Sequence, residues 1–334
     1  MNIQNKDFIF SEFGVSGREE KVSEKIEEFG GKLVDNILYD VTGSLICVKK
    51  GTSKKNKKIM LSAHMDTIGF IITYIDEKGF LRFAEVGNQP DAYLLGKRVV
   101  FENGSIGVIG IERREYEKKL NKDNMFIDIG AKNKEDVLRS VKIGDICAVY
   151  SPYKVNDNII TGGWMDDRIG CFILLEVMES LKNNPNDILF VFSAQEEVGL
   201  RGAQTSSYKI EPDIGLAVDV TESSDLPEGE LLGSCVLGKG AAIKIMDKTV
   251  IIPKRFIQYL CNLADKYEIP FQRDIMRARG TDAHAIQLSR NGVITGGLSV
   301  PVRYIHSASE MCALEDIQAC IDIVKCFCQE EVQL

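Results

Sequence analysis

Residues 187–199, DILFVFSAQEEVG, carry the pattern that decides the fold of this 334-residue chain. The stretch opens with an uninterrupted apolar run, which is typical of a strand buried on both faces of a sheet, and closes on acidic residues. Comparable runs stand at KKIMLSAHMD (57–66), DIGLAVDV (213–220) and GVITGGLSV (292–300). Helical patterns accompany them at 167–184, 253–268 and 314–332. Strands that alternate with helices predict an α/β sheet that helices cover on both faces.

Two regions depart from this alternation. Ser16 and Glu19 have the spacing of a capping box, which predicts a helix over 17–31. Between 69 and 160 the pattern changes to short strands, with hairpin turns at Asp76–Gly79 and Asn103–Gly104. We therefore predict one α/β domain made of 1–68 and 161–334, with a small β-rich module, 69–160, inserted into it.

Composition narrows the class of protein. Hydrophobic residues make up 44% and charged residues 27%, as in a soluble globular protein, and no run of 18 apolar residues predicts a membrane span. The net charge of −8 argues against nucleic-acid binding, which needs a basic face. The first residues lack the apolar core of a secretory signal, and nine cysteines occur without a CxxC pair. We therefore expect reduced thiols and a cytoplasmic protein.

Acidic residues and histidines recur where apolar runs end. In an open α/β sheet the carboxyl ends of the strands meet at one crevice, so we expect these side chains to converge there. Histidine, aspartate and glutamate suit zinc and related divalent cations. Five ligands suffice for two ions about 4 Å apart if one carboxylate bridges them, and such a pair can activate water for hydrolysis. The positions are His64 and Asp66, Asp166 and Asp167, Glu196 and Glu197, Asp219, and His306.

Two of these pairs have an internal logic. In an extended chain Asp66 points the same way as His64, so its carboxylate can accept the far ring N–H and fix the tautomer. Adjacent residues point apart, so one carboxylate of Glu196-Glu197 can bind metal while the other takes a proton from water. Each position also has an ordinary explanation, such as a buried histidine, a helix cap or a solvated charge pair. Together they would require five coincidences that include two of the chain's three histidines.

Other residues carry a weaker signal. His284 lies in a predicted helix, 280–292, where it can simply pack, and Asp282 is either the start of that helix or an orienting group. Cys326 and Cys328 do not share a helix face, so a metal site there is not favoured.

Six ordered blocks resemble those of the M42 metalloaminopeptidases, the TET-type enzymes that include glutamyl and deblocking aminopeptidases. The resemblance implies a mixed α/β sheet flanked by helices, as in metallo-exopeptidases, with an inserted small β-barrel-like domain that serves in dimer-based assembly, commonly into dodecamers. The blocks are AHMDTIG (63–69), WMDDRIGC (164–171), QEEVGLRGA (195–203), AVDVT (217–221), RGTDAHAI (279–286) and RYIHSASEM (303–311).

The resemblance also assigns roles. It implies one metal on His64 and Asp219, another on Glu197 and His306, and Asp166 as the bridge. Glu196 would be the general base, and Asp66 would orient His64. The Asp166-Asp167 peptide would be cis. Zinc is the expected metal, although cobalt and manganese accept the same ligands.

The chain departs from the family pattern at three places. MRARGTDA (276–283) replaces a glycine-rich stretch, Glu222 stands where histidine is common, and HSASE (306–310) replaces HSPxE. Arg277 and Arg279 could contact the substrate, with an acidic first residue favoured by charge pairing, or a neighbouring subunit. With these changes, the sequence does not determine which first residue of a substrate is preferred.

The leading hypothesis is a metal-dependent aminopeptidase that uses metal-activated water. The alternative is a glycoside hydrolase of the cellulase or endoglucanase type, since paired carboxylates can flank a glycosidic bond, but that chemistry needs no histidine ligands. A third hypothesis is a catalytically silent binding or assembly protein.

Overall fold

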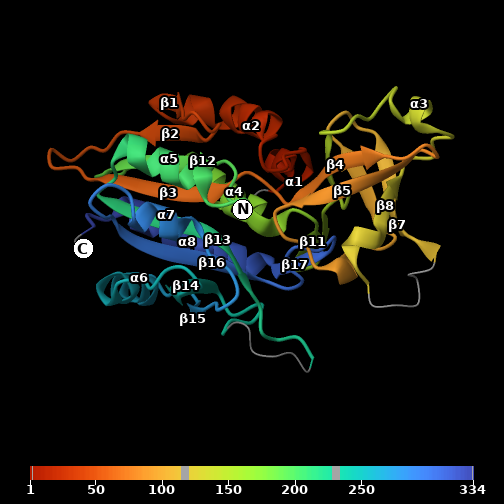
Figure 1. Cartoon of the computed structure of the whole chain (residues 1–334). Helices are drawn as coiled ribbons and strands as arrows, with labels where there is room; N and C mark the ends of the chain where they lie inside the picture. Colours follow the sequence, from red (N-terminus) through yellow and green to blue (C-terminus); the bar gives the residue numbers. More distant parts are fainter. Residues whose placement is uncertain (2, 114–119, 228–233, 333) are drawn as a thin grey trace.

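The chain folds into a large mixed sheet with helices on both faces and a separate closed β-barrel beside it (Figure 1). This computed structural model describes residues 1, 3–113, 120–227, 234–332 and 334. The architecture confirms the predicted α/β class with an inserted small barrel. Among the described residues, no helix is both long and apolar enough to cross a lipid bilayer.

The sheet has eight strands in the order β1-β2-β12-β3-β13-β16-β14-β15. Neighbours in the central group β12, β3, β13 and β16 pair in parallel, and β1, β2 and β14 add antiparallel pairings, so the sheet is mixed. The four apolar runs of the sequence form these central strands, because strands buried on both faces need apolar side chains at every position. The bounds are β1 (Asn36–Tyr39), β2 (Leu45–Lys49), β3 (Lys58–His64), β12 (Asp187–Ser193), β13 (Ile214–Glu222), β14 (Ala241–Met246), β15 (Phe271–Ile275) and β16 (Ile294–Val302).

Helices form two layers over this sheet. Alternate strand residues face opposite layers, as Phe190 and Val191 of β12 do, and each layer has its own buried apolar cluster. The larger cluster lies under α1 (Phe8–Ser11), α2 (Glu20–Gly30), α4 (Met165–Ser180), α6 (Lys254–Lys266) and α8 (Leu314–Gln329). The smaller lies under α5 (Arg201–Ile210) and α7 (Asp282–Gln287). Short helical turns are η1 (Gln4–Lys6), η2 (Gly31–Leu33), η3 (Asp91–Tyr93), η5 (Lys122–Asn124) and α3 (Lys134–Val137).

The barrel closes in the order β4-β5-β8-β7-β6-β9 around its own apolar core, which includes Phe70, Leu81 and Val99. Both predicted hairpins are present, as β4–β5 and β6–β7. The bounds are β4 (Gly69–Ile75), β5 (Phe80–Val86), β6 (Arg98–Phe101), β7 (Ile106–Ile111), β8 (Met125–Asp128) and β9 (Ile146–Val149).

The chain leaves the barrel through a small three-stranded sheet. There β11 (Ile159–Gly162) is the central strand, and it pairs with β10 (Lys154–Asn156) on one side and with β17 (Glu310–Ala313) on the other. The barrel strands therefore occupy 69–149, and the division of the chain at 69–160 into two functional domains stays a prediction.

The predicted capping box is wrong. Helix α2 begins at Glu20, and no side chain caps its first turn. The Ser16 hydroxyl instead donates to Asp66 Oδ2 at 2.6 Å, and Glu19 Oε1 accepts from the backbone of Gly17 and Gln195. A buried carboxylate competes successfully for the serine, because a hydrogen bond to a charged acceptor is stronger than one to the helix end.

Lys6 fastens the N-terminus to the core. Its side chain is 1% exposed, and its ammonium lies 2.8 Å from Glu176 and 2.6 Å from Glu179 on α4. Removing one partner of a buried ion pair leaves the other charges without compensation.

We therefore predict that Lys6→Ala lowers the free energy of unfolding by about 2–3 kcal/mol, below the full penalty for a buried pair because Glu179 is half exposed. Denaturant unfolding followed by circular dichroism measures this change. The control is Lys25→Ala, since Lys25 pairs with Glu28 on the exposed face of α2 and its loss should leave stability almost unchanged. Equal losses in the two variants would contradict the role of Lys6.

Candidate metal centre

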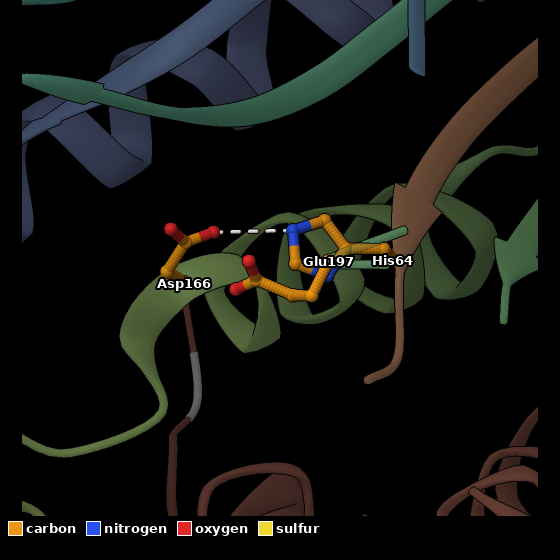
Figure 2. A group of neighbouring side chains, drawn as sticks. All are labelled: His64, Asp166 and Glu197. Carbon is orange, nitrogen blue, oxygen red and sulfur yellow. Dashed lines mark hydrogen bonds and ion pairs between the residues drawn. The ribbon is translucent and has the colours of Figure 1, made fainter. Parts of the chain in front are cut away.

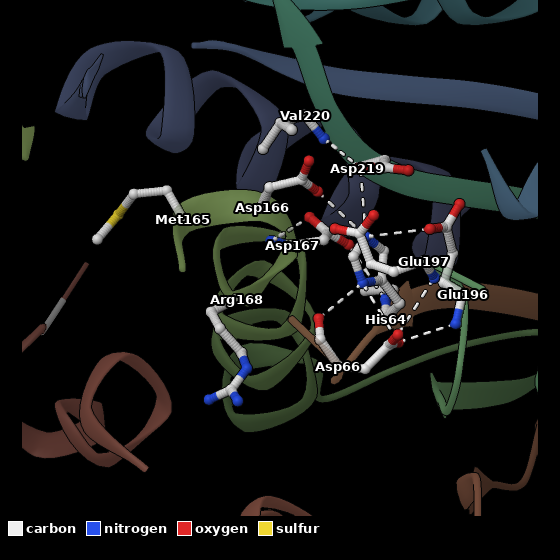
Figure 3. Close-up of polar contacts among 12 residues, drawn as sticks. His64, Asp66, Met165, Asp166, Asp167, Arg168, Glu196, Glu197, Asp219 and Val220 are labelled. Carbon is white, nitrogen blue, oxygen red and sulfur yellow. Dashed lines mark hydrogen bonds and ion pairs between the residues drawn. The ribbon is translucent and has the colours of Figure 1, made fainter. Parts of the chain in front are cut away.

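The predicted site residues converge at the carboxyl ends of the central strands. His64 ends β3, Glu196 and Glu197 follow β12, and Asp219 lies near the end of β13. Asp166 comes from the start of α4 (Figure 3), and His306 follows β16. These six residues line one cavity of about 420 Å³, while Asp66 lies fully buried behind it.

Asp166 stands between the two histidines. Its Oδ1 lies 3.1 Å from His64 Nε2, and its Oδ2 lies 3.3 Å from His306 Nε2. Glu197 Oε1 is 3.1 Å from His306 Nε2, and Asp219 Oδ1 is 4.0 Å from His64 Nε2. Figure 2 shows His64, Asp166 and Glu197 facing one another. The Asp166 carboxylate thus presents one oxygen to the group around His64 and the other to the group around His306.

These distances fit a metal centre. Zinc bonds of about 2.0–2.1 Å in a tetrahedron place ligand atoms roughly 3.4 Å apart. His64, Asp166 and Glu197 offer ligand atoms that all lie within 4.8 Å of one another, as do His64, Asp167 and Asp219. Glu197 Oε1 is buried and accepts no hydrogen bond, although His306 Nε2 is close to it. Such an orphaned acceptor suits a bound cation.

The electrostatics favour cations. Among the described residues around the cavity, buried carboxylates outnumber the two imidazoles, and burial disfavours every unpaired negative charge. Burial accordingly raises the pKa of Glu196 well above its usual range and the pKa of Asp219 to about 7. Burial lowers the pKa of a histidine, but Glu197 and Asp166 outweigh it and raise the pKa of His306 to about 10. Surroundings that raise the pKa of carboxylic acids and of imidazoles alike attract positive charge.

Backbone carbonyls fix how both imidazoles face the cavity. His64 Nδ1 lies 3.0 Å from the carbonyl oxygen of Asp66 and 3.5 Å from its carboxylate. His306 Nδ1 lies 2.5 Å from the carbonyl oxygen of Asn88, in the connection that follows β5 of the barrel. With Nδ1 donating to these carbonyls, each Nε2 faces the cavity and can bind a cation once its own proton is lost.

Asp66 organises the loop that carries Glu196 and Glu197. Its carboxylate accepts hydrogen bonds from Glu196 N at 2.9 Å, from Glu197 N at 3.1 Å and from Ser16 Oγ. Glu19 holds the preceding residue, since its Oε1 accepts from Gln195 N at 3.0 Å. The contribution of Ser16 and Glu19 could not be recognised in the sequence, because their spacing has an equally good local explanation at a helix start.

Glu310 is a second organising group that sequence reasoning missed. It is 2% exposed, and its carboxylate accepts from Met165 N at 2.6 Å, Asp166 N at 3.2 Å and His306 N at 2.7 Å. One side chain therefore sets the backbone of two predicted ligands. Its place four residues after His306 was a signal, but an acidic residue in a loop is usually solvated.

The backbone at the site has uncommon conformations. The Asp166-Asp167 peptide is cis, as the family resemblance implied. Gln195, Leu200 and His306 have positive φ values, which non-glycine residues adopt at a cost and which cluster at functional sites. Asp167 accepts from His64 N at 3.2 Å and from Gly170 N at 3.0 Å, so its carboxylate braces the start of α4.

The remaining candidates lie around the cavity. Arg279 lines it, with Nη1 2.7 Å from the His306 ring. Asp282 is buried and accepts hydrogen bonds from Ser62 and Ser193 at 2.6 Å. His284 lies on the predicted helix, now α7, and contacts the carbonyl oxygen of Thr249 outside the ligand cluster.

Comparison with known proteins gives a consistent result. A family model described as M42 glutamyl aminopeptidase matches residues 43–323. A putative aminopeptidase of Acetivibrio thermocellus is 43% identical over 93% of both chains, and the lysyl aminopeptidase of Pyrococcus furiosus is 32% identical over 95% of this chain and 94% of that protein.

Solved structures agree with the sequence relatives. The aminopeptidase APDkam598 of Desulfurococcus kamchatkensis has a TM-score of 0.94 at 37% identity, covering 99% of this chain and 95% of that chain. The Pyrococcus horikoshii TET1 peptidase, described as assembling into a tetrahedron or a large octahedral shell, has a TM-score of 0.88 at 31% identity, covering 98% and 99%.

One related structure carries a different name. A Thermotoga maritima protein described as an endoglucanase has a TM-score of 0.82 at 32% identity, covering 97% of this chain and 96% of that chain. That name is a mislabel within a family of aminopeptidases, so the glycoside hydrolase alternative is wrong. The two imidazoles among the carboxylates also argue against a glycoside hydrolase, because glycoside hydrolysis needs carboxylates alone. The chain belongs to the M42 family and is a metal-dependent aminopeptidase.

Proposed function

We propose that the enzyme holds two divalent cations, with His64 and Asp219 on one, Glu197 and His306 on the other, and Asp166 between them. The observation that carries this assignment is that the two oxygens of Asp166 face different imidazoles, at 3.1 and 3.3 Å. Asp167 is a poorer ligand, because its carboxylate already accepts two backbone hydrogen bonds. Zinc is the proposed metal, with cobalt or manganese as substitutes.

Two cations in this place would supply a Lewis acid for the first peptide carbonyl and water of lowered pKa. Glu196 is the proposed general base. Its Oε2 lies 3.9 Å from His64 Nε2, so it borders the ligand cluster, and burial raises its pKa, which suits a group that takes and returns a proton. It would take the proton of the attacking water and give it to the leaving amine. Asp66 would act through its hold on His64 and on the Glu196 backbone.

The acidic cluster would also attract the free amino group of a peptide, which explains cleavage from the N-terminus. Arg279 and Lys248 line the same cavity, together with Met276. Two cationic side chains there favour a substrate whose first residue is acidic.

We also propose that the chain self-associates through the inserted segment, 69–160, into a dimer-based oligomer that can extend to a dodecamer. Strand β7 exposes Ile106 and Val108, at 45% and 43%, side by side on the outside of the barrel. Exposed apolar side chains grouped on one module are typical of an interface.

All nine cysteines are free thiols, which supports the proposal that the enzyme works in the reducing cytoplasm.

For the catalytic roles, we predict that Glu196→Gln keeps its metal content but lowers kcat by at least about 100-fold, because the general base is lost. His64→Ala should lose metal as well as activity, since it removes a ligand. Elemental analysis and hydrolysis of an aminoacyl arylamide measure the two effects. Glu24→Gln, on the exposed face of α2, is the matched control. Normal turnover in Glu196→Gln would refute the assignment of the base.

For substrate preference, we predict that Arg279→Ala lowers the ratio of kcat/KM for glutamyl over leucyl arylamide by about tenfold or more, because a charge-assisted hydrogen bond is removed. The ratio cancels any general damage to the site, which matters because Arg279 touches His306. Lys248→Ala should shift the same ratio in the same direction. An unchanged ratio in both variants would show that Arg279 and Lys248 do not select an acidic first residue.

For assembly, we predict that the double variant Ile106→Lys, Val108→Lys has a smaller molar mass than the wild type in light scattering, because two charges then face the interface. The control is Ile251→Lys, since Ile251 is 72% exposed and lies outside the barrel. If the barrel variant kept the wild-type mass, self-association would have to use another surface.

A further inference from the structure

A second cavity, of about 890 Å³, opens beside the metal cavity. It lies over α5 and α7, and its lining includes Val41, Gln204, Tyr208, His284, Leu288 and Arg290. None of these residues belongs to the proposed ligand set or to the general base.

The two cavities are adjacent. Gly199 and Leu200 line both of them. His284 of the second cavity also contacts Thr249 of the first, with its Nδ1 2.9 Å from the Thr249 carbonyl oxygen. Gly199 and Leu200 therefore form the boundary between the two cavities, where Gly199 is exposed and Leu200 is half-buried.

The shared wall is attached to the proposed general base. The backbone N–H groups of Gly199 and Leu200 both donate to the carbonyl oxygen of Glu196, at 2.9 Å. In the proposed function, Glu196 returns its proton to the leaving amine. The part of the substrate beyond that amine must therefore start next to Glu196 and its loop. The free amino group of the substrate would lie at the metals. The substrate residues after the cleaved bond would therefore extend from Glu196 toward Gly199 and Leu200.

The second cavity has the chemistry of a site for apolar side chains. Val41 is 95% exposed, Leu288 is 64% exposed and Tyr208 is 57% exposed, so three apolar surfaces face solvent around one hollow. The nearby cations are already engaged. Arg290 stacks at 3.3 Å on the Tyr208 ring and pairs with Glu211, and Lys209 donates to the carbonyl oxygen of Tyr39. Exposed apolar side chains set among polar groups, next to a reaction site, mark a place where a ligand is bound.

We infer that the second cavity binds the residues of a peptide downstream of the cleaved bond and prefers apolar side chains there. This inference rests on the proposed function, because it takes its direction from Glu196. The enzyme would then select peptides by two separate features, the first residue in the metal cavity and an apolar residue further along.

The experiment compares two substrates that share their first residue. An aminoacyl arylamide reaches only the metal cavity, whereas a pentapeptide with leucine at the third and fourth positions also reaches the second. In Leu288→Asp, kcat/KM for the pentapeptide should fall about tenfold, mostly through KM, because an apolar contact is replaced by a charge. The arylamide should be hydrolysed within about twofold of the wild-type rate, since its groups stay in the metal cavity.

Val41→Asp should reproduce the pattern, and Leu138→Asp is the matched control, because Leu138 is 44% exposed on the barrel side of the chain. Equal changes for both substrates, or none for either, would overturn the inference. So would an altered molar mass of Leu288→Asp in light scattering, which would make this face a subunit interface instead. The arylamide reports on the metal centre by itself, so a failure of the second cavity is distinguishable from a failure of the proposed function.

Discussion

The structure depends on the confinement of many carboxylates around two imidazoles. Burial makes each of these negative charges costly, and the fold meets that cost with hydrogen bonds from the backbone and with positions suited to cations. Asp66, Asp167 and Glu310 are engaged as acceptors of backbone N–H groups. Asp166 and Glu197 instead turn oxygens toward the histidines. In the proposed function, the first group of carboxylates supports the backbone and the second group binds metal.

The crevice is assembled from segments far apart in the chain. The barrel begins at Gly69, shortly after Asp66, and the chain returns from it to Asp166 through β11, so the insertion lies between two site segments. The barrel contributes to the site, since the carbonyl oxygen of Asn88 orients His306. The N-terminal segment contributes as well, through Ser16 and Glu19. Proposed assembly through the barrel would therefore act on an element that touches the catalytic centre.

The two cavities have different tasks in the proposed function. The metal cavity holds the proposed ligands and the proposed general base, and Arg279 and Lys248 lie on its wall. The proposed downstream site lies on α5 and α7, where a residue can change without disturbing a ligand. Under these proposals, selectivity and catalysis would be carried by different side chains of the same domain.

Sequence alone determined the α/β class, the inserted barrel and the residue types of the centre, because apolar runs and the acidic or histidine residues that end them are local patterns. The tertiary structure decided which carboxylates brace and which face the cavity, since Asp166 and Asp167 are neighbours in sequence but differ in their contacts. It also gave Ser16, Glu310 and Asn88 their partners. Those hydrogen bonds join residues up to 218 positions apart, and local spacing contains no information about which distant atoms folding brings together.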